Sequence, residues 1–153
     1  MKRFRSFFVL SSAIIFAAAA YNFYPEEELP EQCRIDRMEV WKSVRKLRAF
    51  SGGKIVKIYD ISLGKNPVGD KEYEGDNKTP EGIYSINDKN SNSQFHLNLG
   101  ISYPDNSHAA EAQKSGKSAG GDIKIHGLRN GIGFIGKFHR LIDWTSGCIA
   151  VTN

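Results

Sequence analysis

Cysteine, proline and regular metal-binding spacings are scarce in this sequence. Two cysteines among 153 residues cannot build a disulfide-dense scaffold, and they do not form a CxxC pair. The four histidines show no HxxxH spacing, so a common signature of a zinc site is missing. No internal repeat or low-complexity block follows the N-terminal segment. These absences exclude disulfide-stapled miniproteins and repeat arrays.

Excess charge of one sign is also scarce once the N-terminus is set aside. The 21 basic and 17 acidic residues give a formal charge of +4, and Lys2, Arg3 and Arg5 supply three of those charges. The rest of the chain is therefore close to neutral, which argues against a nucleic-acid partner. With 40% hydrophobic and 11% aromatic residues the chain is globular, and its length suits one domain rather than two.

The first 24 residues have the layout of an export signal. A basic stretch at residues 1–5 precedes an uncharged apolar run at residues 7–20, and Ala18-Ala19-Ala20 offers the small-x-small pattern of a signal peptidase site. Fourteen apolar residues are short of the roughly twenty that span a bilayer, although extension to residue 24 gives an uncleaved anchor. Both alternatives predict that the remaining chain lies in the periplasm or cell envelope, with the membrane contacted only through this segment.

The next residues read as a spacer before a single domain. Residues 25–30 (PEEELP) are acidic with a proline at each end, which is typical of a solvated linker. We assign the spacer to residues 25–37 and the domain to residues 38–153. For the Glu run alone, a helix start is an equally good interpretation.

Alternating apolar and polar residues predict a β-rich body. Residues 46–50 and 54–63 flank Ser51-Gly52-Gly53, which is a hairpin signal. Residues 95–103 alternate along a strand, with Gly100 as a candidate bulge. Further elements are expected as strands at 83–86 and 122–126, polar loops at 64–75 and 88–93, a helix at 105–114, a helical turn within 132–142, and a strand or helix start at 38–41. This pattern, with 15 glycines for turns, favours a mainly β fold with short helices (α+β) built as a barrel or sandwich.

Cys148 and His126 are the strongest candidates for chemistry. Gly147 precedes Cys148 in a polar turn, and glycine permits a tight bend at which backbone N–H groups converge on a developing oxyanion. A thiol needs a base near neutral pH, and His126 ends an apolar strand just before Gly127. Spacing alone does not exclude the other three histidines, at positions 96, 108 and 139. A structural cysteine and a disulfide with Cys33 also stay open at this point.

A wider set of motifs resembles the L,D-transpeptidase catalytic domain (YkuD-type). The matching segments are Ile125-His126-Gly127, Thr145-Ser146-Gly147-Cys148, Asn153, Asn66-Pro67-Val68-Gly69 and Lys78-Thr79-Pro80-Glu81-Gly82. The resemblance covers residues 54–153 and implies a YkuD-type β fold. It implies acyl transfer on peptidoglycan stem peptides, with cell-wall cross-linking or remodelling as the outcome. It implies no cofactor and no metal.

The resemblance also assigns roles to residues. Cys148 falls on the nucleophile and His126 on the base, while the Gly127 carbonyl orients the histidine. The backbone N–H groups of Gly147 and Cys148 fall on the oxyanion hole. Cys148 would attack a stem-peptide carbonyl, release the terminal D-amino acid and pass the acyl group to an amine or to water.

Three features depart from the family pattern. The histidine usual before Gly-Cys is Ser146, and the arginine usual two residues after the cysteine is Ala150, which cannot pair with a carboxylate. We name Lys78 and Arg129 as candidates for the missing charge, although a surface role suits either. These changes resemble a subgroup that includes hydrolases of peptidoglycan amide links, such as the link to an envelope lipoprotein. The sequence also stops five residues after Cys148, sooner than is usual in the family.

Two further expectations complete the interpretation. A non-catalytic peptidoglycan-binding module is the alternative to an enzyme, and we expect a monomer. Trp41 and Trp144 are expected to pack rather than to bind substrate, and Asp143 is expected to serve as a turn or cap residue.

Overall fold

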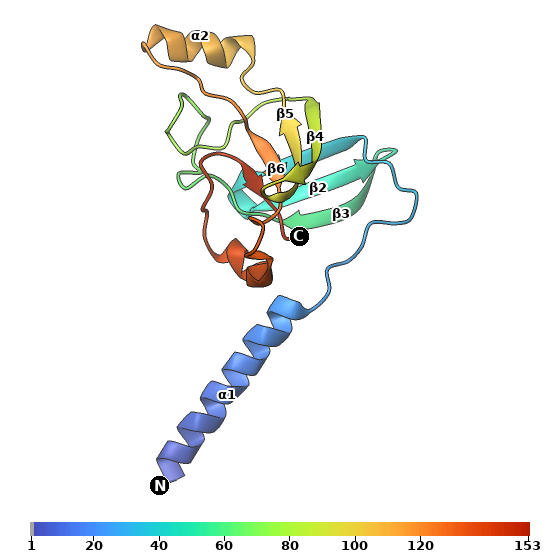
Figure 1. Ribbon diagram of the computed structural model, residues 1–153, viewed down its shortest axis with the longest axis vertical. Helices are drawn as coiled ribbons and strands as arrows, with labels where there is room; N and C mark the ends of the chain where they lie inside the picture. The colour runs from blue at the N-terminus through green and yellow to red at the C-terminus, as the bar shows by residue number, and fades with distance from the viewer. Residues whose placement is uncertain (1) are drawn as a thin grey trace.

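The computed structural model describes residues 2–153, with side chains described from residue 11 onward. Two short 3-10 helices, η1 and η2, accompany the α-helices and strands (Figure 1). The elements in chain order are α1 (Lys2–Phe23), β1 (Arg37–Trp41), η1 (Lys42–Val44), β2 (Lys46–Ser51), β3 (Lys54–Asp60), β4 (Ile86–Ser93), β5 (His96–Ile101), α2 (Asn106–Lys114), β6 (Lys124–His126), η2 (Gly133–Leu141) and β7 (Ile149–Ala150).

The first sheet is an antiparallel meander in the order β1-β2-β3. The predicted hairpin is confirmed, because Ser51 pairs with Lys54 across a turn formed by Gly52 (φ 55°) and Gly53 (φ 77°). Two successive positive φ angles suit glycine and match the twist of a two-residue hairpin. The segment at 38–41, which fitted a strand or a helix, belongs to β1.

The second sheet has the order β4-β5-β6-β7, antiparallel except for the last pair. The prediction of a loop at residues 88–93 is wrong, since these polar residues form most of β4. They pair with β5 while staying largely exposed, so hydrophobic alternation gave no signal. The irregularity expected at Gly100 lies opposite it, where the β4 register shifts between Ile86 and Asp88.

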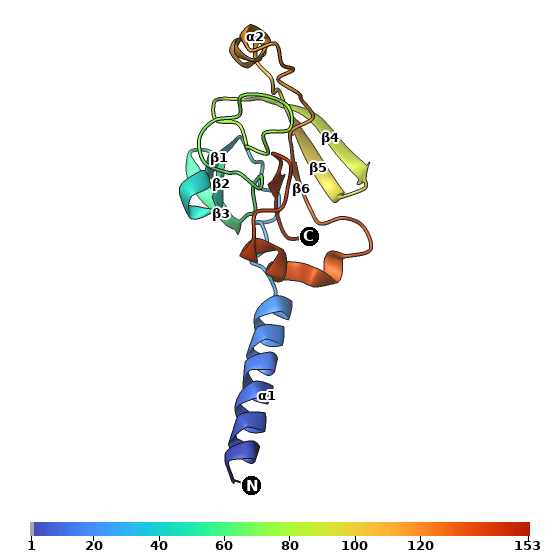
Figure 2. The same ribbon diagram turned by 90° about the vertical axis from the view of Figure 1, so that its left-hand side faces the viewer.

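The main core joins residues from both sheets. It is built from Leu47, Ile61, Leu63 and Ile149, each at most 4% exposed. Single bridges, Ser62 with Ala150 and Gly64 with Thr145, connect the segment after β3 to the segment around β7. The two sheets therefore meet without forming one continuous ladder. Of the two expected forms, a barrel or a sandwich, the described residues do not form a closed barrel, whereas the α+β class is confirmed. Figure 2 shows β1–β3 and the β4–β5 hairpin on opposite sides of β6.

The predicted helical segments are largely confirmed. Asp105 caps α2 by accepting the His108 N–H at 2.9 Å. The segment within 132–142 forms η2, which is kinked at Gly136. η2 lies where α1 approaches the body of the protein (Figure 1).

α1 extends away from the body and contacts it at its C-terminal end (Figures 1 and 2). Asn22 is 8% exposed, donates to the Phe134 carbonyl at 3.3 Å and accepts the Phe138 N–H at 3.3 Å. In the following spacer, Glu26 pairs with Arg140 at 2.6 Å. Part of the segment expected to be solvated is thus fixed to η2. Within residues 2–153, no helix is both long and apolar enough to cross a membrane.

Candidate active site

A cleft of about 490 Å³ opens on the four-stranded sheet. It contains both residues predicted to carry the chemistry, Cys148 and His126. Its lining residues come from the β4–β5 hairpin, β6 and the segment before β7, namely Asn90, Asn92, Ser93, Gln94, Phe95, Asn98, Asp122, Lys124, His126, Trp144, Thr145, Ser146 and Cys148. Residues distant in sequence are therefore brought together at one place.

The register of β6 and β7 explains why base and nucleophile face the same cleft. The strands are parallel, with Ile125 opposite Ile149 and His126 opposite Ala150. Side chains alternate along a strand, so Cys148 falls on the face that carries His126. The intervening Ile125 and Ile149 point to the other face, where they join the core. Core packing on one face therefore fixes the reactive groups on the other.

His126 is held in one tautomer. It is 6% exposed, and its Nδ1 lies 2.7 Å from the Gly127 carbonyl oxygen. A carbonyl only accepts, so Nδ1 carries the proton and Nε2 keeps its lone pair for use as a base. Burial lowers the pKa of His126 below its usual value, and the nearby Lys124 charge acts in the same direction. The Gly127 carbonyl opposes the shift without reversing it, so the ring is neutral at pH 7.

Cys148 is a partly buried free thiol. Burial raises its pKa above the usual value, while a backbone hydrogen bond from Lys124 and the Lys124 charge oppose that shift. The thiol and the imidazole are therefore both neutral at rest. The Cys148 thiol donates to the Asp122 carbonyl at 3.7 Å. Cys33 is also free.

The turn that presents Cys148 is tied together by Thr145. The Thr145 hydroxyl donates to the Cys148 carbonyl at 2.7 Å and accepts the Gly147 N–H at 3.1 Å. Gly147 has φ +137°, and a Cβ there would lie 2.8 Å from the Lys78 carbonyl oxygen, so only glycine fits. The Gly147 N–H named as an oxyanion donor is thus engaged with Thr145 in this structure. Ser146, at the position of the family histidine, is exposed at the rim.

Asp143 anchors the same loop from behind. Its carboxylate accepts the Leu63 N–H at 2.9 Å and pairs with Arg45 at 2.7 Å. Since both partners lie outside the cleft lining, these contacts match the turn role expected for Asp143. Asn153 acts similarly on the other side, where its Oδ1 accepts the Leu128 N–H at 2.6 Å. The segments that follow the base and precede the nucleophile are therefore each fixed by a carboxylate or amide side chain.

An aromatic wall supports His126. The Phe95 ring centroid lies 4.7 Å from that of His126, and the Trp144 ring meets it edge-on at 5.7 Å. Trp144 packs, as expected, although it does so inside the cleft. On its far side, Trp144 Nε1 donates to His139 Nδ1 at 3.4 Å. Trp41 is 46% exposed, under the Arg48 guanidinium.

The other candidate histidines lie elsewhere. His139 is 5% exposed, and its Nδ1 and Nε2 contact Ser62 and Thr152. His108 is part of α2 and lies between Asp70 and Asp105, whose carboxylates raise its pKa despite the opposing effect of burial. His96 is exposed at the start of β5. None of these three lines the cleft.

The two proposed substitutes for the missing arginine stand outside the cleft lining. Lys78 pairs with Glu72, and Arg129 is exposed after the β6 strand. The cation that does line the cleft is Lys124, whose Nζ lies 2.7 Å from Asp122 Oδ1. Sequence reasoning missed Lys124 and Asn98. Lys124 lies two residues before His126, and Asn98 lies opposite His126 in the β5–β6 ladder. These positions indicate that both residues line the cleft only when the strand pairing is known.

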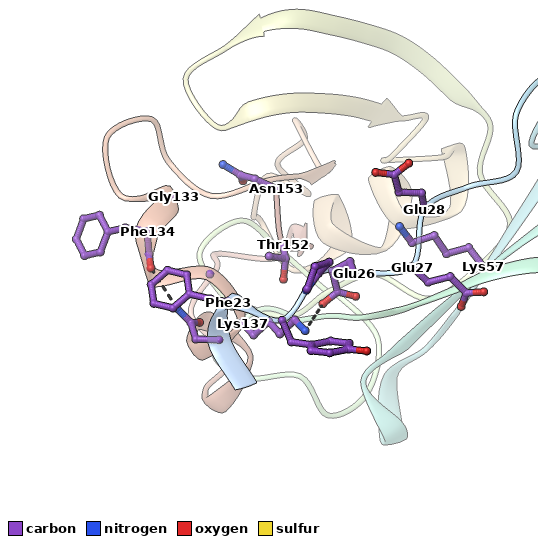
Figure 3. Close-up of a pocket in the computed structure, with 14 residues that line it drawn as sticks. Phe23, Glu26, Glu27, Glu28, Lys57, Gly133, Phe134, Lys137, Thr152 and Asn153 are labelled. Carbon is purple, nitrogen blue, oxygen red and sulfur yellow. Dashed lines mark hydrogen bonds and ion pairs between the residues drawn. The ribbon is translucent and has the colours of Figure 1, made fainter. Parts of the chain in front are cut away.

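A second cavity, of about 480 Å³, lies between the end of α1, the spacer and η2 (Figure 3). Glu26, Glu27 and Glu28 line it together with Lys57 and Lys137. Neither a cysteine nor a histidine lines this cavity. Among the residues that the structure describes, no group of three or more His, Cys, Asp or Glu side chains is placed to hold a metal ion. The two candidate residues for nucleophilic chemistry, Cys148 and His126, thus line the cleft on the four-stranded sheet and not this cavity.

Two comparisons with known proteins give matches. The L,D-transpeptidase catalytic domain model, YkuD, matches residues 36–153. Among solved structures, Bd1075 of Bdellovibrio bacteriovorus matches with 26% sequence identity and a TM-score of 0.49. That match covers 76% of this chain and 39% of the other, so this chain spans well under half of that length. A search of curated proteins gives no match. On the family match across residues 36–153, the chain belongs to the L,D-transpeptidase catalytic domain family.

Proposed function

We propose that this protein is a cysteine acyltransferase acting on peptidoglycan stem peptides, of the L,D-transpeptidase type. The observation that carries the proposal is the pairing of β6 with β7, which places His126 and Cys148 on one face of the cleft. The fixed tautomer of His126 supports it, because Nε2 is left free to accept a proton. Family membership supplies the substrate class.

The proposed reaction has two halves. His126 Nε2 takes the thiol proton while Cys148 Sγ attacks the carbonyl carbon of the scissile amide. The tetrahedral intermediate collapses as His126 returns the proton to the leaving nitrogen, which releases a D-amino acid and leaves a thioester on Sγ. An acceptor amine or water then attacks the thioester, His126 takes its proton, and the thiolate recovers that proton as the product leaves.

The oxyanion is assigned to backbone donors at the turn. The Cys148 N–H is the first candidate. The Gly147 N–H joins it only by leaving Thr145 Oγ1, a 3.1 Å hydrogen bond that is modest in strength. Removing an oxyanion donor typically costs about 10²–10³ in turnover, so this exchange is a sensitive point of the site.

Two versions of this function differ in the acceptor of the acyl group, an amine or water, and in the amide bond that is broken. Ala150 is fully buried in β7 and supplies no charge to the cleft, so recognition of a substrate carboxylate falls to Lys124. A lysine is a point charge without the paired donors of arginine. This difference favours a broader substrate choice and keeps hydrolysis of peptidoglycan amide links, including a link to an envelope lipoprotein, as the second candidate.

We place this activity in the periplasm or cell envelope. The basic start and apolar run of residues 1–20 support export, whether the segment is removed or kept as an anchor. Peptidoglycan is the partner in either case, and the protein acts as a monomer without metal or cofactor.

The test is intact-mass analysis of muropeptides incubated with the purified protein and with Cys148→Ala. Cross-linked dimers made only by the wild-type protein establish transpeptidation. Shortened or released peptides without dimers establish hydrolysis. If Cys148→Ala gives the same products as wild type, or neither changes any muropeptide, the catalytic proposal fails and binding to isolated sacculi becomes the function to measure.

A further inference from the structure

One side wall of the cleft holds a buried polar atom without a partner. Asn98 is 7% exposed and lines the cleft, and its Nδ2 donates to Ser93 Oγ at 2.9 Å. Its Oδ1, by contrast, has no hydrogen-bond partner in the part of the chain whose side chains are described. A buried acceptor without a donor destabilises the fold, so such an atom in a cleft points to a ligand that supplies the donor.

The direction of this oxygen is fixed by the hairpin around it. Ser93 is 7% exposed, and its hydroxyl oxygen also accepts the Phe95 N–H at 2.9 Å. The Asn98 amide is held to this anchored hydroxyl through its nitrogen. Since the amide nitrogen is engaged with Ser93, Oδ1 is the amide atom left for another partner.

Asn98 is the neighbour of His126 across the β5–β6 ladder. The two residues are directly opposite in the antiparallel register, and the Gly127 N–H donates to the Leu97 carbonyl at 3.2 Å beside them. This pattern marks a pair without its own backbone hydrogen bonds, in which side chains approach most closely. Cys148 lies on the other side of β6, next to β7, so His126 stands between the nucleophile and Asn98.

We infer that Asn98 Oδ1 accepts a hydrogen bond from the nitrogen that leaves or enters during acyl transfer, an assignment that rests on the proposed function. The scissile amide carries one N–H, and in the proposed reaction His126 adds a second proton to the same nitrogen. An acceptor beside His126 that holds the existing N–H turns the nitrogen lone pair toward Nε2. An incoming amine has two N–H bonds, one for Asn98 and one for His126. The partner chemistry is thus an N–H donor.

The experiment compares two acyl donors that differ in this one group. One is a muropeptide ending in an amide-linked D-alanine, and the other carries D-lactate, so that an ester oxygen replaces the scissile N–H. Turnover of both is measured for wild type, Asn98→Leu and Asn98→Ala. The control is Asn87→Leu, which removes an exposed amide from β4 outside the cleft lining.

We expect the leucine variant to lose at least tenfold in kcat/KM on the amide donor and to stay within twofold on the ester donor. Asn98→Ala should give the same difference in kcat/KM between the amide and ester donors. Agreement between the two variants assigns the effect to the missing acceptor rather than to altered packing in one of them. Asn87→Leu should change turnover of neither donor by more than twofold. The leucine removes an unpaired acceptor together with the 2.9 Å hydrogen bond to Ser93 Oγ, so its unfolding midpoint should stay close to that of wild type.

Equal losses on amide and ester overturn the inference, and so does an amide rate that neither variant changes. The proposed function has its own failure, in which wild type turns over neither donor. That outcome overturns the inference as well, and it is recognised from the wild-type protein alone.

Discussion

The two sheets contribute differently to the hydrophobic core and to the cleft. The three-stranded sheet supplies Leu47, Ala49 and Phe50 to the interior, yet it contributes nothing to the cleft lining, all of which lies between residues 90 and 148. The four-stranded sheet carries His126, the proposed base, and leads into Cys148, the proposed nucleophile, while burying fewer large apolar side chains. Stability and chemistry are therefore expected to respond to different substitutions, although they share the core at Ile149.

The sharpest test of this division is His126→Gln. Loss of a general base typically lowers turnover by about 10²–10⁴-fold, whereas the lost hydrogen bond to Gly127 should cost only about 1 kcal/mol of stability. Turnover of muropeptides and thermal unfolding measure the two effects. His96→Gln, an exposed histidine of the same sheet, serves as the control. Similar losses of activity in both variants would contradict the assignment of the base.

The converse test removes packing from the other sheet. Leu47 is 1% exposed in β2, so Leu47→Ala should destabilise the protein by about 2–5 kcal/mol. Leu97→Ala, at a leucine 53% exposed in β5, should change stability by about 0.5 kcal/mol or less. Urea unfolding gives both values. The labelling rate of Cys148 in the folded protein should stay at the wild-type value in both, and a large change in Leu47→Ala would show that the sheets are coupled.

Acid should destabilise the protein through two buried histidines, His139 in η2 and His126 in the four-stranded sheet. Burial lowers the pKa of His139 from 6.5 to about 4, so between these values the unfolded chain binds a proton that the folded protein does not. Stability should therefore be complete above pH 6.5 and fall by up to about 3 kcal/mol as the pH approaches 4. The downward shift at His126 acts in the same direction.

The measurement for this effect is the urea midpoint between pH 7.5 and 4 in wild type and His139→Gln. The variant should show a shallower fall across this window. A slope identical to that of wild type would mean that His139 does not carry the effect. The low pKa of Asp76, about 2, keeps that carboxylate from contributing until the pH is below about 4.

The smallest effect is expected at the turn that presents the thiol. Thr145→Val keeps the shape of a residue that is 5% exposed but removes the hydroxyl that joins Gly147 to Cys148. We expect alkylation of Cys148 and turnover to change by about tenfold, a difference of about 1.4 kcal/mol. Thr145→Ser retains the hydroxyl and should stay within about twofold. A serine variant as impaired as valine would assign the effect to packing of the methyl group.

The sequence predicted those parts of the fold that depend on local chemistry. The hairpin at Gly52-Gly53 and the helix capped by Asp105 follow from backbone preferences of a few residues. The sequence did not predict strand β4, because its residues are polar and their conformation depends on pairing with β5. The alternation in β5 was visible, but Leu97 is 53% exposed while Asn98 is buried, so the apolar face was not the buried one there.

The site divides in the same way. The motifs around His126 and Cys148 indicated the two reactive residues, and the structure places them in one cleft. Lys124 and Asn98 gave no signal because their position depends on the registers of β5, β6 and β7, which join segments far apart in the chain. For the same reason, the sequence did not indicate that Lys124, rather than Lys78 or Arg129, is the cation that lines the cleft.

The chain between His126 and Cys148 is held at both ends and at η2, and it is open at Gly131. Asn153 fixes Leu128 at one end, and Thr145 fixes the turn at the other, whereas Gly131 projects into open space with φ +89°. Exposed loop tips of this kind tolerate added residues. An insertion beside Gly131 should therefore change what the enzyme meets at its surface without moving the atoms that react. The loop is where new recognition can be engineered, or can evolve, on an unchanged catalytic frame.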